Sequence, residues 1–197
     1  MRLALLGFLR VPRASIAAGF LRMCGLALLM GWAQGCSVAE GEDSFTLEIA
    51  TTVEIPAGGP TDSALLEFPV LGGLTELDLS RTSAFESRGY LPEDVKQVTV
   101  TSVKLSALGP PGQDLNFLGE VRVLVDTEGV PTKLLARADD FPPGTERVQM
   151  EASTDNVMAW LIGLPGRIHV VALASQRPAR ATQVELRFKF DLVVRVY

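Results

Sequence analysis

The sequence has 197 residues, 47% of them hydrophobic, and its 18 basic and 23 acidic residues give a formal net charge of −5. Four of the basic residues lie before residue 36, so the remainder carries 14 basic and 23 acidic residues, a net of −9. An acidic balance argues against nucleic acid as a partner and against electrostatic adhesion to anionic lipid.

Residues 1–35 have the parts of a secretory signal peptide. Their only charges are four arginines, Arg2, Arg10, Arg13 and Arg22. An apolar core over residues 23–33 follows, within an uncharged run of 17 residues that ends at Ala39. A helix that spans a membrane needs about 20 apolar residues, so a signal peptide is favoured over a permanent anchor.

The segment Ala33-Gln34-Gly35-Cys36 resembles the lipobox of bacterial lipoproteins, in which a small residue precedes a cysteine. In that family the cysteine becomes thioether-linked to diacylglycerol and is then acylated on its amino group. The resemblance implies that Cys36 is the lipidation site and that its acyl chains attach the protein to a membrane. More than one chain is needed for stable anchoring, and such a cysteine carries several.

The same resemblance places the protein in a bacterial cell envelope. In many lipoproteins of Gram-negative bacteria, an aspartate after the cysteine favours retention at the inner membrane. Ser37 stands at that position, so the outer membrane is favoured. Two alternatives are an ordinary secretory signal cut near Gly35 and an uncleaved N-terminal anchor.

The only cysteines are Cys24, in the signal peptide, and Cys36. The chain after Cys36 therefore has no disulfide, no cysteine-ligated metal and no cysteine nucleophile. About 150 residues are enough for one domain held together by an apolar core. We expect a signal peptide over residues 1–35, a lipid-anchored tether over 36–44 and one domain over 45–197.

Alternation of apolar and polar residues predicts strands in this domain, separated by proline and glycine clusters. The expected strands are 45–55, 64–70, 74–79, 95–108, 117–126, 133–138, 147–152, 167–174 and 180–197. The leucine and glutamate content of residues 74–79 leaves a helix as the alternative there. The apolar phase changes near Thr101 and Ser102, which predicts a bulge or a twist, and it is interrupted after Asp191.

Short helices are expected over residues 83–91 and 155–163, the second capped by Asp155. The pattern contains no repeated helix between strands. It predicts an all-β fold, an antiparallel β-sandwich of immunoglobulin-like or jelly-roll-like type with a signal helix in front, and a closed barrel is the alternative.

Candidate chemical groups are few. His169 is the only histidine and lies within an expected strand, which favours a side chain on a sheet face. Six carboxylates fall near turns, where oxygen ligands for calcium can gather, but they lack the spacing of a calcium loop; they are Asp114, Asp126, Glu128, Asp139, Asp140 and Asp155. Trp160 and its apolar neighbours are expected to close one end of the core.

The sequence has no nucleophile elbow, zinc-protease, Walker or dinucleotide-binding motif. We predict no catalytic, cofactor-binding or metal-binding residues and no cofactor. The expected role is a non-enzymatic binding or structural module with an envelope protein as a possible partner. The alternatives are a periplasmic carrier of lipid or another hydrophobic ligand, and a small hydrolase that uses carboxylates.

Overall fold

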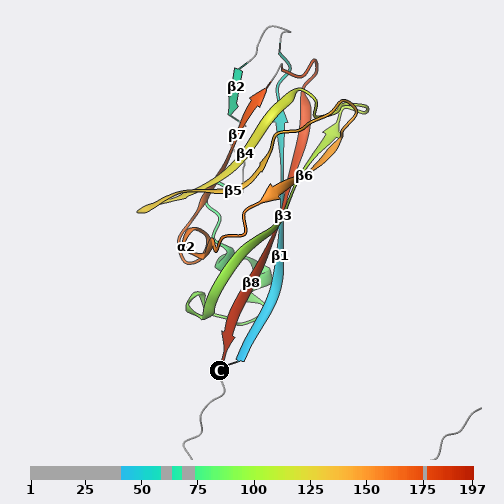
Figure 1. Ribbon diagram of the computed structural model, residues 1–197. Coiled ribbons are helices and arrows are strands. Elements are labelled where there is room, and N and C mark those ends of the chain that lie inside the picture. Colours follow the sequence, from blue (N-terminus) through green and yellow to red (C-terminus); the bar gives the residue numbers. More distant parts are fainter. Residues whose placement is uncertain (1–40, 59–63, 68–73, 175–176) are drawn as a thin grey trace, which may run out of the picture. The chain divides into compact units, whose positions relative to one another are not determined.

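The structure, a computed structural model, describes residues 41–58, 64–67, 74–174 and 177–197 (Figure 1). The expected signal peptide and Cys36 lie outside the described residues. Within those residues, no helix has both the length and the apolar character that a membrane span requires.

The described chain is built from antiparallel strands, as predicted. The strands are β1 (Gly41–Ile55), β2 (Ala64–Glu67), β3 (Val95–Gly109), β4 (Leu118–Thr127), β5 (Val130–Ala138), β6 (Arg147–Ala152), β7 (Arg167–Ala174) and β8 (Thr182–Val196). Their order in the sheet is β1-β8-β3-β6-β5-β4-β7-β2. Short helices α1 (Ser83–Glu86) and α2 (Met158–Leu161) and the 3-10 turns η2 (Leu79–Arg81) and η3 (Pro92–Asp94) lie between strands.

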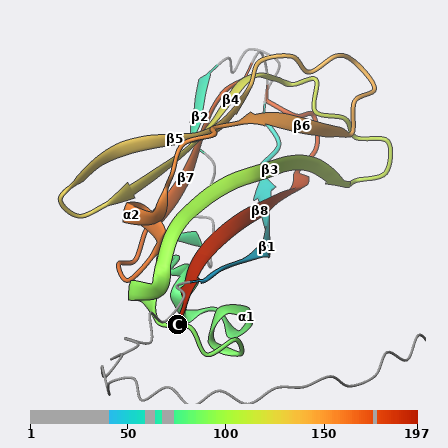
Figure 2. The same cartoon turned by 60° about the horizontal axis from the view of Figure 1, so that its bottom comes forward.

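Strand β6 joins two layers. Residues 147–150 of β6 pair with β3, whereas residues 151–152 pair with β5. A strand that changes partner in this way lets a sheet fold over on itself. Strands β1, β8 and β3 lie side by side in one layer (Figures 1 and 2), and β5, β4, β7 and β2 form the other.

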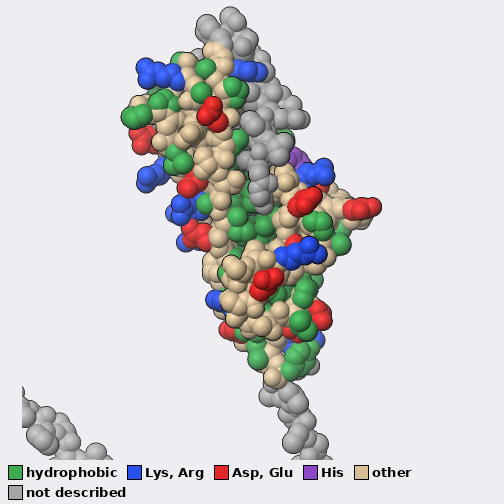
Figure 3. All heavy atoms as spheres, turned by 180° about the vertical axis from the view of Figure 1, so that it is seen from behind, with side chains coloured by type: hydrophobic (Ala, Val, Ile, Leu, Met, Phe, Trp, Pro, Cys, Tyr) green, Lys and Arg blue, Asp and Glu red, His purple; other side chains and the backbone are tan. Residues whose placement is uncertain are grey.

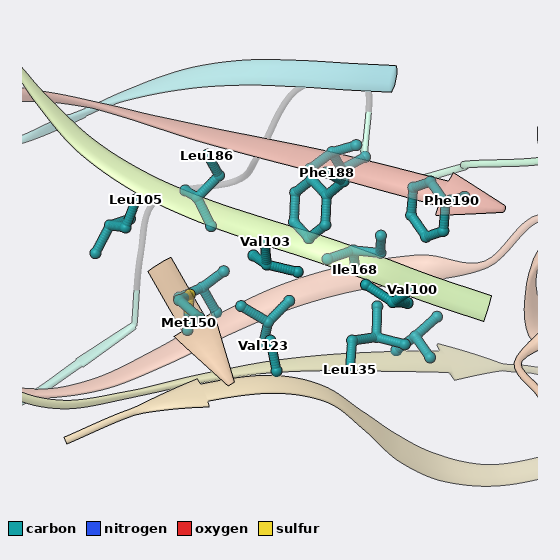
Figure 4. Packing of buried hydrophobic residues seen from close by; sticks show 14 of the residues in the cluster. Val100, Val103, Leu105, Val123, Leu135, Met150, Ile168, Leu186, Phe188 and Phe190 are labelled. Carbon is teal, nitrogen blue, oxygen red and sulfur yellow. The ribbon is translucent and has the colours of Figure 1, made fainter. Parts of the chain in front are cut away.

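The core lies between the two layers. Every second residue of β8 from Thr182 to Val194 is buried, which follows from the alternation of side chains along a strand. Phe188 and Phe190 of β8 and Val103 of β3 point toward Val123 of β4 and Ile168 of β7 (Figure 4). These side chains are at most 1% exposed, so apolar burial holds the layers together.

The phase change expected in β3 is confirmed, because the pairing of β3 with β8 shifts register between Val100 and Ser102. The interruption expected after Asp191 is wrong. Leu192 and Val194 continue the buried series of β8, and Val193 lies on the other face. Because Leu192, Val193 and Val194 are all apolar, the sequence does not show the alternation that the buried Leu192 and Val194 continue.

The strand expected over residues 74–79 is also wrong. Leu74, Leu77 and Leu79 are buried, but they lie in turns and in one isolated bridge, which pairs Leu77 with Gly166. The carboxylate of Asp78 accepts hydrogen bonds from the Ser80 N–H (3.0 Å) and the Gly163 N–H (3.2 Å). This buried carboxylate caps η2 and ties it to the loop after α2, which bends the chain away from strand geometry.

The two expected helices are present in shortened form, but Asp155 does not cap the second. The Asn156 side-chain oxygen accepts hydrogen bonds from the N–H groups of Met158 (3.0 Å) and Val98 (3.1 Å). Asp155 instead forms an ion pair with Lys133. The Asn156 side chain therefore connects the start of α2 to β3.

Strand β1 begins at Gly41, four residues before the expected Phe45, so only residues 36–40 of the expected tether precede it. Residues 41–44 pair with residues 193–196 of β8. Asp43 accepts a hydrogen bond from the Tyr90 hydroxyl (2.6 Å), and Glu42 pairs with Lys96 at 2.7 Å. These side-chain contacts fix the beginning of the strand to β3 and to the segment before η3.

Acid should loosen this strand end. The hydrogen bond from Lys96 lowers the pKa of Glu42, and that from Tyr90 lowers the pKa of Asp43. A pKa lower in the folded than in the unfolded state stabilises the fold at neutral pH, and this contribution is lost as the pH falls below about 4. Amide protection factors over residues 41–45 should therefore fall between pH 7 and pH 3. The Glu42→Gln, Asp43→Asn double variant should show the low values already at pH 7, and equal protection of the native chain at both pH values would contradict this account.

Candidate functional site

The outer face of the β1-β8-β3-β6 layer carries a shallow groove of about 370 Å³, which we call the outer groove. Its walls combine charged side chains with one serine and one exposed leucine. The lining residues are Glu48, Lys104, Ser106, Leu108, Arg147, Glu185, Arg187 and Lys189. They come from four strands that are distant in the sequence, so the groove exists only through the sheet order.

Strand register sets the pattern of charge in the outer groove. Lys104 of β3 is the direct partner of Arg187 of β8, which places two cations opposite each other. Ser106 is the partner of Glu185 on one side and of Arg147 on the other. Basic side chains therefore lie next to one another across three strands of a protein whose overall balance is acidic.

The two carboxylates of the outer groove, Glu48 and Glu185, form ion pairs with basic residues of β8. Arg187 Nη1 lies 2.8 Å from Glu48 Oε1, and Arg187 Nη2 lies 3.1 Å from Glu185 Oε2. Lys189 Nζ lies 3.3 Å from the other Glu48 oxygen. The hydrogen bond from Arg187 lowers the pKa of Glu48, and the bond to Glu48 raises the pKa of Arg187.

Lys104 and Arg147 make no ion pair within the part of the chain that the structure describes. Both side chains are exposed, and the Ser106 residue between them is buried. Two cations flanking a hydroxyl on a shallow surface can bind a carboxylate through charge-assisted hydrogen bonds. The outer groove thus presents two cations without ion pairs among the described residues, to which an anionic group could bind.

The Lys104→Glu variant should be more stable than the native chain. Like charges on directly opposed strand positions are destabilising, and an opposite pair contributes about 0.2–1 kcal/mol. The substitution turns the Lys104–Arg187 contact into such a pair, so urea unfolding should show a gain of about 0.5 kcal/mol. The same change at Lys133, which is already paired with Asp155, should lower stability instead. A loss of stability in Lys104→Glu would show that this register does not exist.

His169 lies on the outer face of β7, as the sequence predicts for a side chain on a sheet face. Its Nδ1 is 3.1 Å from the Asp126 carboxylate of the neighbouring strand β4. The Asp126 carboxylate also accepts a hydrogen bond from the Thr132 hydroxyl. The three side chains hold β4, β5 and β7 in register on the solvent face.

The turn carboxylates singled out from the sequence are dispersed. Asp126 and Glu128 line a second surface hollow with Glu76 and Arg167, and Asp139 and Asp140 border a third. Asp114 accepts a hydrogen bond from the Gly144 N–H (2.7 Å), which joins two loops. Among the described residues, no three histidine, cysteine, aspartate or glutamate side chains are arranged to hold a metal ion.

The apolar cluster around Trp160 belongs to the core, as predicted. Val157 and Leu161 are fully buried, and Met158, Trp160 and Ile162 pack against the core as partly buried neighbours. The Trp160 Nε1–H donates a hydrogen bond to the Pro131 carbonyl (2.9 Å). The indole therefore links α2 to the β4–β5 hairpin.

The carrier alternative concerns the interior of the domain. A carrier needs a cavity of about 300 Å³ or more lined by apolar side chains. Among the described residues, buried aliphatic and aromatic side chains lie between the layers (Figure 4). The hollows of about 370 Å³ lie on outer faces and have charged linings.

No protein-family model matches the chain, and no curated protein is similar to it in sequence.

Proposed function

We propose that this chain is a lipid-anchored protein of a bacterial cell envelope, attached through acyl chains on Cys36 and located at the outer membrane. The support is the order of features in the leader: four arginines, an apolar core and a small residue before the cysteine. The acidic balance of the remaining chain agrees with attachment by acyl chains, because it offers anionic lipid no general attraction.

The domain acts in this proposal as a non-enzymatic binding module. Its outer groove holds an acidic segment of another envelope protein. The observation that carries this role is the pair Lys104 and Arg147, which lack ion pairs among the described residues; Lys104 lies opposite Arg187, and Arg147 lies opposite Ser106. Arg187 is already paired with Glu48 and Glu185, so Lys104 and Arg147 are the cations of the groove that a partner's carboxylates can neutralise.

Labelling cells with a radioactive fatty acid tests the anchor. The native chain should incorporate label and fractionate with the outer membrane, and Cys36→Ala should lose the label. Cys24→Ala is the matched control, since Cys24 lies in the segment removed with the signal peptide, and it should label normally. Equal labelling of the Cys36→Ala variant would refute lipidation at this site.

Binding of a fluorescent polyglutamate peptide tests the outer groove. The Lys104→Gln, Arg147→Gln double variant should bind about five- to tenfold more weakly, as expected for two exposed charge contacts. The control is Arg122→Gln, Arg137→Gln, which changes the net charge equally but removes cations already paired with Glu120 and Glu151. Equal weakening by both double variants would reduce the effect to overall charge and would refute a specific groove.

A further inference from the structure

One end of the domain, where β1 begins and β8 ends, exposes large apolar and aromatic side chains. We call it the basal end and define it by Gly41, Leu91, Val196 and Tyr197. Val196 is the direct partner of Gly41. Leu91 follows Tyr90, whose hydroxyl binds Asp43 two residues after Gly41. Figure 2 shows the end of β8 with α1 beside it.

The side chains of the basal end are unusually exposed for their type. Tyr197 is 71% exposed, Leu91 54% and Val196 39%. Hydrophobic side chains also gather at the lower end of the described residues in Figure 3. Single exposed apolar residues need no explanation, but three of them at one end form a surface suited to contact.

The charges at the basal end are engaged locally. Glu42 pairs with Lys96, and Asp43 accepts the hydrogen bond from Tyr90. The Arg88 guanidinium lies over the Phe45 ring, 4.5 Å from its centroid. Arg195 donates a hydrogen bond to the Tyr197 hydroxyl (3.0 Å) and lies over its ring, and Glu93 and Asp94 follow Leu91. With acids at least as numerous as bases, this surface lacks the basic excess that anionic lipid requires, and its chemistry suits the headgroup level of a neutral bilayer, where tyrosine is enriched.

The short tether between Cys36 and β1 keeps this end of the domain close to the membrane. This step rests on the proposed lipidation of Cys36. Four residues, 37–40, separate the lipid-bearing Cys36 from the paired strand, and the five residue steps from Cys36 to Gly41 span at most about 18 Å. Strand β1 cannot lend further length without breaking its pairs with β8 and the Asp43–Tyr90 contact.

We propose that the basal end rests on the bilayer surface, with Leu91, Val196 and Tyr197 at headgroup level. The domain then stands upright on its acyl anchor. Lys104 lies nine residues along β3 from Val95, about 30 Å at 3.3 Å per residue. This orientation holds the outer groove clear of the membrane and open to a partner protein.

Site-directed fluorescence on the full lipidated protein tests the orientation. The only cysteines of the chain are Cys24 and Cys36, so a cysteine added to the domain is the one free thiol of the processed protein. Leu91→Cys and Tyr197→Cys report on the basal end. Leu108→Cys is the matched control, because Leu108 is 53% exposed near the opposite end of β3.

Each variant is labelled with bimane and reconstituted in phosphatidylcholine–phosphatidylethanolamine vesicles with or without a lipid that carries a nitroxide quencher in its headgroup. The Leu91→Cys and Tyr197→Cys labels should lose most of their emission to the quencher, and the Leu108→Cys label should keep its emission. No quenching at any site in protein that floats with the vesicles would overturn the docking and leave the anchor intact. Equal quenching at all three sites would mean that the domain lies flat, which also overturns it. Protein that fails to float with the vesicles would refute the anchor and the docking together.

Discussion

Replacing Phe188 by alanine should lower the free energy of unfolding by about 3–5 kcal/mol. Phe188 is fully buried at the middle of β8, where its direct partners are Ile49 of β1 and Val103 of β3. Its ring stacks on Phe190 with centroids 6.0 Å apart and planes inclined by 10°. Truncation removes apolar burial and leaves a cavity between two layers that β6 holds in place. Domains of this size have a total stability of about 5–15 kcal/mol, so the loss is a large share of it.

Urea unfolding followed by circular dichroism measures the effect. Phe188→Leu is the control, because it keeps most of the volume and should cost under about 1.5 kcal/mol. An alanine variant that loses less than its leucine counterpart would show that this face of β8 does not point into the core. The unfolding slope should stay unchanged in both variants, since neither alters the surface exposed on unfolding.

The strands are the part of the fold that the sequence predicts well. A strand with one buried face can be recognised from its alternating apolar and polar residues. Strands β1, β4, β7 and β8 each have one buried face along most of their length. Even the register shift in β3 leaves a trace, because an extra residue moves the apolar series from one phase to the other. Local pattern and tertiary burial agree in these strands.

Prediction fails where burial does not follow from a periodic backbone. Leu77 and Leu79 have the spacing of strand residues, yet they and Leu74 are buried from turns, and Asp78 in this segment contacts Gly163. The contact joins residues 85 positions apart, and no local pattern encodes it. Similarly, Asp155 does not cap α2, and the Asn156 side-chain oxygen instead accepts hydrogen bonds from Met158 at the start of α2 and from Val98 of a distant strand.

The outer groove could not be predicted for a related reason. Lys104 and Arg187 are ordinary exposed residues of two strands when each strand is considered alone. They become opposed like charges only because β3 lies next to β8 in one register. A shift of one residue would turn each side chain to the other face. The sequence therefore predicts an acidic domain, and the sheet order creates a basic surface upon it.

The Gly166→Ala substitution should destabilise the domain by about 1–3 kcal/mol through overpacking. A methyl group at Gly166 would lie 2.3 Å from the Trp160 carbonyl oxygen and 3.0 Å from Leu161 Cδ2. The oxygen belongs to the backbone of α2, so α2 and the start of β7 would have to separate. Gly166 also exchanges two backbone hydrogen bonds with Leu77, at 2.8 and 2.9 Å.

In the Gly166→Ala variant, we expect the contacts around residue 166 to loosen more than the rest of the domain. Separation of α2 from β7 pulls on the Leu77 bridge, so amide exchange at Leu77 and Gly166 should accelerate more than exchange in β3. Gly109→Ala is the matched control, because a methyl group there meets nothing within 4 Å and should change stability by less than about 0.5 kcal/mol. If the two alanine variants unfold at the same urea concentration, the close approach of α2 to β7 is not present in the folded chain. A selective loss at Gly166 would instead show that the segment over residues 74–79, for which the sequence predicts a strand, is held by its contacts with this turn.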